Sequence, residues 1–147
     1  MKSKKKLPRG MRNNNPLNIR IGNQWIGERS VNTDGEFEQF VSLEYGLRAG
    51  LKLISRYINH YRLNTIEKII RRWAPYTENA TLGYIGVVVY LTKIKKDEPL
   101  FFENEMQMIK LVYAMSYVEN GVCLDAKVIQ KAYQMLTEER IVSEAFA

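Results

Sequence analysis

The chain has 147 residues, 46% of them hydrophobic, and a formal net charge of +6, which is typical of one globular domain with its own core. One cysteine and one histidine exclude an internal disulfide and a zinc site built from these residue types, and the sequence has no glycine-rich phosphate loop. We therefore expect no metal, nucleotide or other cofactor, so any chemistry has to use ordinary side chains.

Residues 1–12 are predicted to form a basic, flexible tail. Six of the 22 basic residues lie in this tail, which leaves sixteen basic and sixteen acidic residues from Asn13 onward. A tail of this kind can contact nucleic acid, anionic membrane or teichoic-type polymers, but a solvated leader is the favoured interpretation. Because the rest of the chain is close to neutral, we expect no specific nucleic-acid partner.

The sequence predicts neither a signal peptide nor a membrane span. Asn13-Asn14-Asn15 stands where the apolar part of a secretory signal is required, and the most apolar run, residues 85–91, is too short to cross a bilayer. The protein is therefore expected to be made in the cytoplasm. Reaching a virion, the periplasm or a cell wall would require a separate route.

Residues 13–41 contain turn formers, three glycines and short mixed segments, which predicts loops and a small sheet. Asp34-Gly35 between Val31 and Phe37 predicts a hairpin turn, because glycine tolerates the positive φ that tight hairpins require. The small amount of β-structure in the fold is therefore expected near the N-terminus.

From residue 43 to residue 61 the apolar residues recur with the period of an amphipathic helix. Ser42 is its predicted cap, since a serine hydroxyl accepts a hydrogen bond from a free N–H of the first turn. The apolar positions are Leu43, Leu47, Leu51, Ile54, Ile58 and Tyr61.

Two shorter helical segments are predicted next. The first is capped by Asn64, with Glu67 placed to bond back to the cap, and it ends before Pro75. The second begins after Asn79, although Val87–Val89 also fits a strand because β-branched residues favour strands. The residues of this second helix predicted to face inward are Leu82, Ile85 and Val89.

Two more helices follow a charged connector at residues 93–99. One ends at Asn120-Gly121, and the other begins after Asp125 as its cap. The fold class is therefore mainly α, within α+β, with one domain over residues 13–140 and a frayed segment at 141–147. The apolar faces of these helices consist of Met108, Leu111, Met115 and Val118, then Val128, Ile129, Ala132, Tyr133 and Leu136.

Glu119 is the residue whose position best suits acid–base chemistry. It falls at the C-terminal end of a predicted helix, where the helix dipole is negative, and Tyr117 and Val118 make its surroundings apolar. Both effects favour the protonated carboxylic acid, the form that glycoside cleavage requires as proton donor. From the residues alone, an ordinary polar helix end is the favoured interpretation of Glu119, and His60 is expected at the surface.

Five short motifs occur in order between residues 10 and 121, and together they resemble a family of phage-encoded proteins described as virion structural proteins or endolysins. The resemblance implies that this chain is a phage protein. The motifs are Arg12-Asn13-Asn14-Asn15-Pro16-Leu17-Asn18-Ile19-Arg20, Trp25-Ile26-Gly27, Phe40-Val41-Ser42-Leu43-Glu44-Tyr45-Gly46-Leu47-Arg48-Ala49, Arg72-Trp73-Ala74-Pro75, and Glu78-Asn79 with Tyr84.

The same pattern is similar to lysozyme-like glucosaminidases and lytic transglycosylases. Those enzymes share the asparagine-rich turn, the Trp-x-Gly step and an aromatic segment that residues 84–88 match. Their catalytic glutamate helix comes first, whereas residues 114–121 come last here. The resemblance therefore implies a lysozyme-like domain, and a circular permutation would explain the different motif order. This hypothesis requires Glu119 to lie close to Asn18 and Tyr84.

The resemblance implies cleavage of peptidoglycan glycan strands by a transglycosylase or muramidase-type reaction, with Glu119 as general acid and base. A hydrolase would need a second acid, for which Asp34, Glu28 and Glu44 are candidates. The alternative is a virion protein that binds glycan or neighbouring virion proteins without cleaving anything. The residues expected to bind substrate are Asn15, Asn18, Trp25, Tyr45 and Tyr84, although the two asparagines equally fit a role in the turn backbone.

Overall fold

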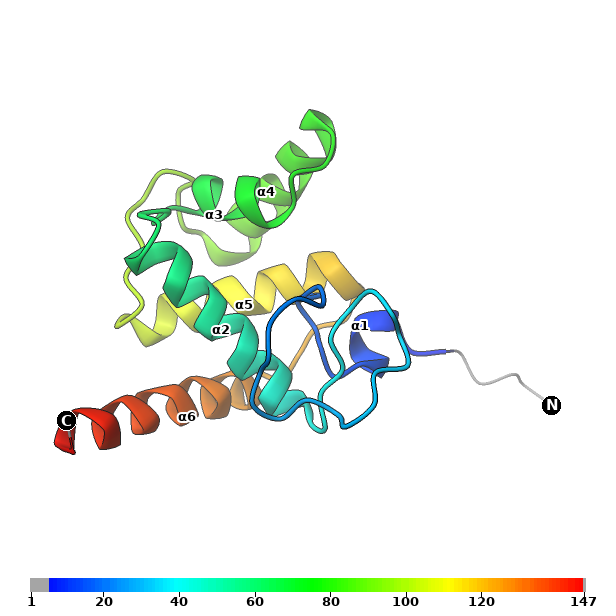
Figure 1. Ribbon diagram of the computed structural model, residues 1–147. Helices are drawn as coiled ribbons and strands as arrows, with labels where there is room; N and C mark the ends of the chain where they lie inside the picture. The colour runs from blue at the N-terminus through cyan, green and yellow to red at the C-terminus, as the bar shows by residue number, and fades with distance from the viewer. Residues whose placement is uncertain (1–5, 147) are drawn as a thin grey trace.

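The computed structural model describes residues 6–146, and within this span the chain is mainly helical (Figure 1). The middle of the molecule holds α2 and α5, with α6 on one side and the α3–α4 pair on the other, while the N-terminal loops lie beside the end of α5. None of the described helices is both long and apolar enough to cross a bilayer. The helices are α1 (Arg9–Arg12), α2 (Leu43–Asn59), α3 (Ile66–Trp73), α4 (Glu78–Thr92), α5 (Glu105–Asn120) and α6 (Ala126–Ala145).

The predicted start and buried face of α2 are confirmed. The Ser42 hydroxyl accepts a hydrogen bond from the Tyr45 N–H at 3.4 Å, as expected of the cap. Tyr61 is the exception, because α2 ends at Asn59 and the ring of Tyr61 is 43% exposed. The buried apolar residues of α2 include Leu47, Leu51, Ile54 and Ile58.

The prediction for the start of α3 is wrong by one residue. Thr65 is the cap, and its hydroxyl accepts from the Lys68 N–H at 3.2 Å, whereas Asn64 precedes the helix. Both residues are good caps, and the structure selects the one that places Ile66, Ile69 and Ile70 in the core.

The segment from Glu78 to Thr92 is a helix throughout, so the strand alternative for Val87–Val89 is wrong. It begins earlier than predicted, after Thr77, whose hydroxyl accepts from the Ala80 N–H at 3.2 Å. Leu82 is 48% exposed instead of buried, since α4 packs on α3 and α5 through a different face. That face includes Thr81, Tyr84, Ile85 and Val88.

The predicted C-terminal end of α5 and the predicted start of α6 are confirmed. Gly121 follows α5 with a φ of 68°, the left-handed conformation that glycine adopts without strain, and the Asp125 carboxylate accepts from the Lys127 N–H at 2.9 Å. The segment after residue 140, for which fraying is predicted, is helical in the structure. Helix α6 continues to Ala145, with an Arg140–Glu144 ion pair at 3.1 Å one turn apart.

The folded region also begins before the predicted boundary at residue 13. Residues 1–5 of the basic tail lie outside the described residues, but Arg9–Arg12 form α1, and Gly10 is buried. The tail prediction is therefore too long at its C-terminal end, because α1 packs against α5.

The N-terminal loops contain two isolated antiparallel bridges, Arg20 with Phe37 and Glu28 with Phe40. The expected hairpin turn at Asp34-Gly35, between Val31 and Phe37, is not confirmed, because Phe37 forms its bridge with Arg20. The Asp34 carboxylate instead accepts from the N–H groups of Glu36 and Phe37 at 3.1 and 2.9 Å, which satisfies the turn locally.

Candidate functional site

Three distant segments meet at Glu119, the second-last residue of α5. The side-chain amide of Asn18 donates to one carboxylate oxygen of Glu119 at 2.8 Å, and the Tyr84 hydroxyl donates to the other at 2.9 Å. Asn18 belongs to the N-terminal loops and Tyr84 to α4. Residues far apart in the sequence are thus brought together around one carboxyl.

The turn that carries Asn18 is held by the side chain of Asn15. This amide donates to the carbonyls of Ile19 and Glu38 at 2.9 and 3.0 Å, and its oxygen accepts from the Ile19 N–H at 3.0 Å. The sequence allows two roles for Asn15, binding of substrate and support of the turn backbone. Asn15 is fully buried, so its side chain offers no surface to a substrate and supports the turn backbone. Asn120 then ties the turn to α5 by donating to the Pro16 carbonyl at 2.7 Å.

The environment of Glu119 favours its protonated form. Burial raises the pKa of the Glu119 carboxyl above its ordinary value of 4.5, and the hydrogen bonds from Asn18 and Tyr84 oppose part of this rise. The direction is the one predicted from the apolar surroundings. Burial, followed by the charge of Glu119, also raises the pKa of Tyr84 well above 10, so its hydroxyl remains a donor.

Glu119 and Asn18 line a cleft of about 440 Å³. Tyr84 does not line it and is 5% exposed, so this hydroxyl reaches Glu119 from the protein side and positions the carboxyl. The wall is rich in aromatic rings, whose flat apolar faces suit stacking on sugar rings. The aromatic residues that line the cleft are Phe37, Tyr57, Trp73 and Tyr76.

Of these four rings, the sequence motifs include only Trp73. The Trp73 side chain packs against the core and also lines the cleft, and its indole N–H donates to the Leu17 carbonyl at 3.2 Å. Tyr76, which is 61% exposed next to Pro75, is missed by the sequence reasoning. The sequence signal that could have identified Tyr76 is its place directly after the proline motif that ends a helix.

Trp25 and Tyr45 are not brought to the Glu119 cleft. Both pack against the small cluster formed by Ile19, Phe40 and Ala49. Trp25 also lines a second cavity of about 700 Å³ along α2. Direct contact of Trp25 or Tyr45 with a sugar beside Glu119 is therefore not supported by their placement.

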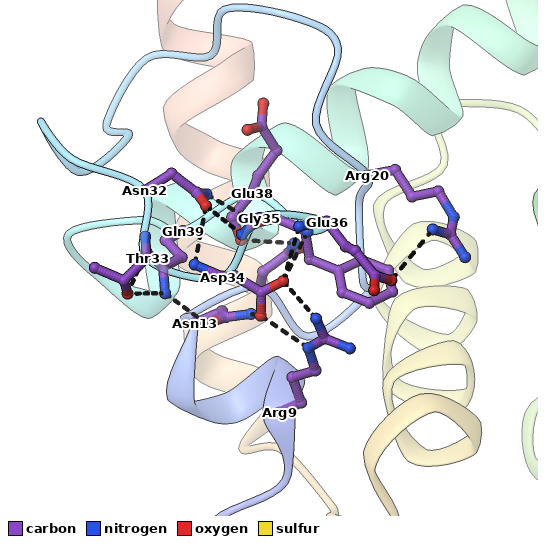
Figure 2. A network of polar contacts seen from close by, with 12 residues as sticks. Arg9, Asn13, Arg20, Asn32, Thr33, Asp34, Gly35, Glu36, Glu38 and Gln39 are labelled. Atoms are coloured by element: carbon purple, nitrogen blue, oxygen red, sulfur yellow. Dashed lines mark hydrogen bonds and ion pairs between the residues drawn. The ribbon is translucent and has the colours of Figure 1, made fainter.

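Asp34, one candidate for a second acid, lies in a polar network that joins α1 to the loop at residues 32–39 (Figure 2). Its carboxylate accepts two hydrogen bonds from the Arg9 guanidinium at 2.8 and 2.7 Å and one from Asn13 at 2.9 Å. The Arg9 guanidinium holds the pKa of the Asp34 carboxyl well below its usual range. Asp34 therefore has a structural role, holding α1 against this loop.

The other two candidate acids also lie outside the cleft lining. Glu28 accepts from the Trp25 N–H at 3.1 Å, and Glu44 lies in the first turn of α2, where the positive end of the helix dipole stabilises its charge. Burial, then the neighbouring Glu28, raises the pKa of Glu38 to about 7, and Figure 2 shows the Glu38 carboxyl pointing away from the Asp34 network. Among the described residues that line the cleft, only Glu119 has a carboxylate.

Residues 6–146 contain no group of three or more histidine, cysteine, aspartate or glutamate side chains placed to hold a metal ion. Cys123 is exposed and free. His60 is exposed at the end of α2, as predicted, and its ring contacts Tyr61 edge-on.

Comparison with known proteins confirms the predicted relationship to phage proteins. No protein-family model matches the sequence. The chain is 42% identical over 117 residues to Protein P5 of Pseudoalteromonas phage PM2, and the alignment covers 77% of this chain and 71% of that protein. Identity at this level over most of both chains is shared ancestry, and the chain therefore belongs to the family of Protein P5 of phage PM2.

Proposed function

We propose that the chain cleaves glycan strands of peptidoglycan, with Glu119 as general acid and then general base. The observation that carries this proposal is the pair of hydrogen bonds, from Asn18 and Tyr84, that fixes a partly buried carboxyl in an aromatic cleft. A carboxylic acid with a raised pKa and a fixed orientation is what protonation of a glycosidic oxygen needs.

In the first step, Glu119 donates its proton to the glycosidic oxygen as the bond to the anomeric carbon breaks. The sugar that keeps the anomeric carbon develops positive charge, and the Glu119 carboxylate now acts as base. If it removes the proton from a hydroxyl of the same sugar, that oxygen bonds to the anomeric carbon and an anhydro ring closes. This route needs no second carboxylate, and the described lining of the cleft offers none, so we favour the transglycosylase reaction over hydrolysis.

The fold is proposed to be lysozyme-like and circularly permuted. The support is that a glutamate at the end of a late helix contacts the asparagine-rich turn and the aromatic of α4, which is the set of contacts expected if the termini had moved while the packed helices stayed in place. This arrangement places the acid last in the chain without changing its partners.

The test is incubation of the protein and its Glu119→Gln variant with purified peptidoglycan, followed by mass spectrometry of released fragments. Anhydro-muropeptides from the wild type alone would support the transglycosylase reaction, and reducing ends would indicate a muramidase or glucosaminidase. Release by neither protein across a range of pH and salt, beside an active control enzyme, would contradict the proposal.

A second candidate function is a phage virion protein that binds glycan or other virion proteins and cleaves nothing. The relationship to a phage protein supports a role in a phage more directly than it supports catalysis. On this reading Glu119→Gln keeps full affinity for glycan strands, and neither protein releases fragments. Co-purification with assembled virions, compared with a phage enzyme that acts only at lysis, would test the structural role.

A further inference from the structure

A second cavity lies beside the Glu119 cleft, between the loop at residues 23–26 and one face of α2. Its volume of about 700 Å³ exceeds that of the cleft. Its described lining includes the side chains of Lys52 and Arg56, together with the amide residues Asn23, Gln24 and Asn59. It has no role in the cleavage step proposed above.

The described lining of this cavity is basic and contains no acidic residue. Within residues 6–146, Lys52 and Arg56 form no ion pair. Arg48 at the same cavity is 1% exposed, and its guanidinium donates to both carboxylate oxygens of Glu139 at 2.9 and 2.7 Å. The Arg48 charge is thus compensated by Glu139. The hydrogen bond from Arg48 and, to a smaller extent, the charge of Lys52 lower the pKa of the Glu139 carboxyl. Among residues 6–146, however, neither Lys52 nor Arg56 is held in an ion pair, so both side chains can contact a ligand.

The two cavities adjoin on α2. Leu53 lines both of them, with Tyr57 on the side of the Glu119 cleft and Lys52 and Arg56 on the other side. Consecutive helix residues are turned by about 100° from one another, so these pairs occupy neighbouring faces of the same helix. A branched ligand can therefore occupy the cleft with one branch and the basic cavity with the other.

We propose that the basic cavity binds a carboxylate-bearing peptide attached to the glycan strand, which rests on the proposed function of the cleft. Peptidoglycan stem peptides carry several carboxylates spaced by amide bonds. Lys52 and Arg56 supply two cations for the carboxylates, and Asn23 and Asn59 supply donors and acceptors for the amides. The near-neutral body and the neutral amides in the cavity lining fit a peptide of low charge better than a polyphosphate chain.

The test measures binding without turnover, in Glu119→Gln protein. The probes are soluble glycan strands with their stem peptides and the same strands freed of peptides by an amidase, and the readout is isothermal titration calorimetry. We expect about tenfold tighter binding of the peptide-bearing strands, the order of two charge-assisted contacts at a partly exposed site. The double variant Lys52→Gln, Arg56→Gln should lose this preference and bind both strands equally.

The matched control is Lys127→Gln, Lys131→Gln, which removes two exposed charges on α6 outside the cavity lining and should keep the preference. Arg56→Lys keeps the positive charge and should keep most of the preference for peptide-bearing strands. Equal binding of both strands by the parent protein, or an unchanged preference in the Lys52→Gln, Arg56→Gln variant, would overturn the proposal. Because no cleavage is measured, absence of catalysis would contradict only the proposed enzymatic reaction.

Discussion

Replacing Gly10 by alanine is expected to displace the residues that hold Glu119 in position. Gly10 lies in α1, and an added Cβ would collide with the Asn120 side-chain oxygen and would lie 2.8 Å from the Asn18 side-chain oxygen. It would also lie 2.9 Å from the backbone carbonyl oxygen of Asn15. All three atoms belong to the turn and the helix end that hold Glu119, so relief of the collision has to move the site.

The expected change in the free energy of unfolding is the sum of opposing effects. Alanine is favoured over glycine inside a helix by about 1 kcal/mol. Overpacking of a close contact costs about 1–3 kcal/mol, and loss of the Asn18 hydrogen bond to Glu119 costs about 1 kcal/mol more. We expect a net loss of about 2 kcal/mol in the free energy of unfolding, which for a chain of this size lowers the melting temperature by roughly 6 °C.

The assay is urea and thermal unfolding followed by circular dichroism, with Gly83→Ala as the matched control. Gly83 is exposed in α4, and an added Cβ there meets no atom within 4 Å apart from its chain neighbours and the backbone of its own helix, so this variant should gain about 0.5–1 kcal/mol. A second readout is an NMR titration of the Glu119 carboxyl carbon, whose midpoint should rise in Gly10→Ala because the Asn18 bond lowers this pKa. If Gly10→Ala were as stable as Gly83→Ala with an unchanged titration, the reasoning would be refuted.

Three further predictions concern titrating groups. Tyr84→Phe removes a hydrogen bond that lowers the pKa of Glu119, so the NMR midpoint should rise and stability should fall by about 1 kcal/mol; an unchanged midpoint would contradict the positioning role. Asp34→Asn should be less stable than wild type at pH 7, and the difference should shrink as pH falls below about 3.8, because the folded pKa of Asp34 lies below that ordinary value; urea midpoints across pH check this. Glu38 has its pKa raised from 4.5 to about 7, so wild-type stability should fall as pH rises through that window, and Glu38→Gln should be more stable at pH 8 by on the order of 2 kcal/mol but not at pH 4.

The amino-acid sequence by itself determined most of the helices. Ser42, Asp125 and Gly121 act through groups within a few residues of themselves, so their capping roles are visible without the fold. For the same reason, the position of Glu119 at the end of a helix and the direction of its pKa shift are predictable from the neighbouring residues.

Where the sequence allows two local structures equally well, the tertiary structure decides between them. Asn64 and Thr65 are both competent caps, and burial of the α3 isoleucines selects Thr65. Leu82 has the correct helical spacing for a core position, but α4 turns a different face toward α5, because packing partners are not encoded in periodicity.

Which residues surround Glu119 could be determined only from the fold. The contact between Asn18 and Glu119 joins residues 101 positions apart, and only the motif resemblance indicated that they should meet. Tyr76 reaches the cleft, whereas Trp25 lies in the neighbouring cavity, since the orientation of loops depends on the helices beneath them. Local rules thus decided the helices and the chemistry available to Glu119, and long-range packing decided which side chains surround it.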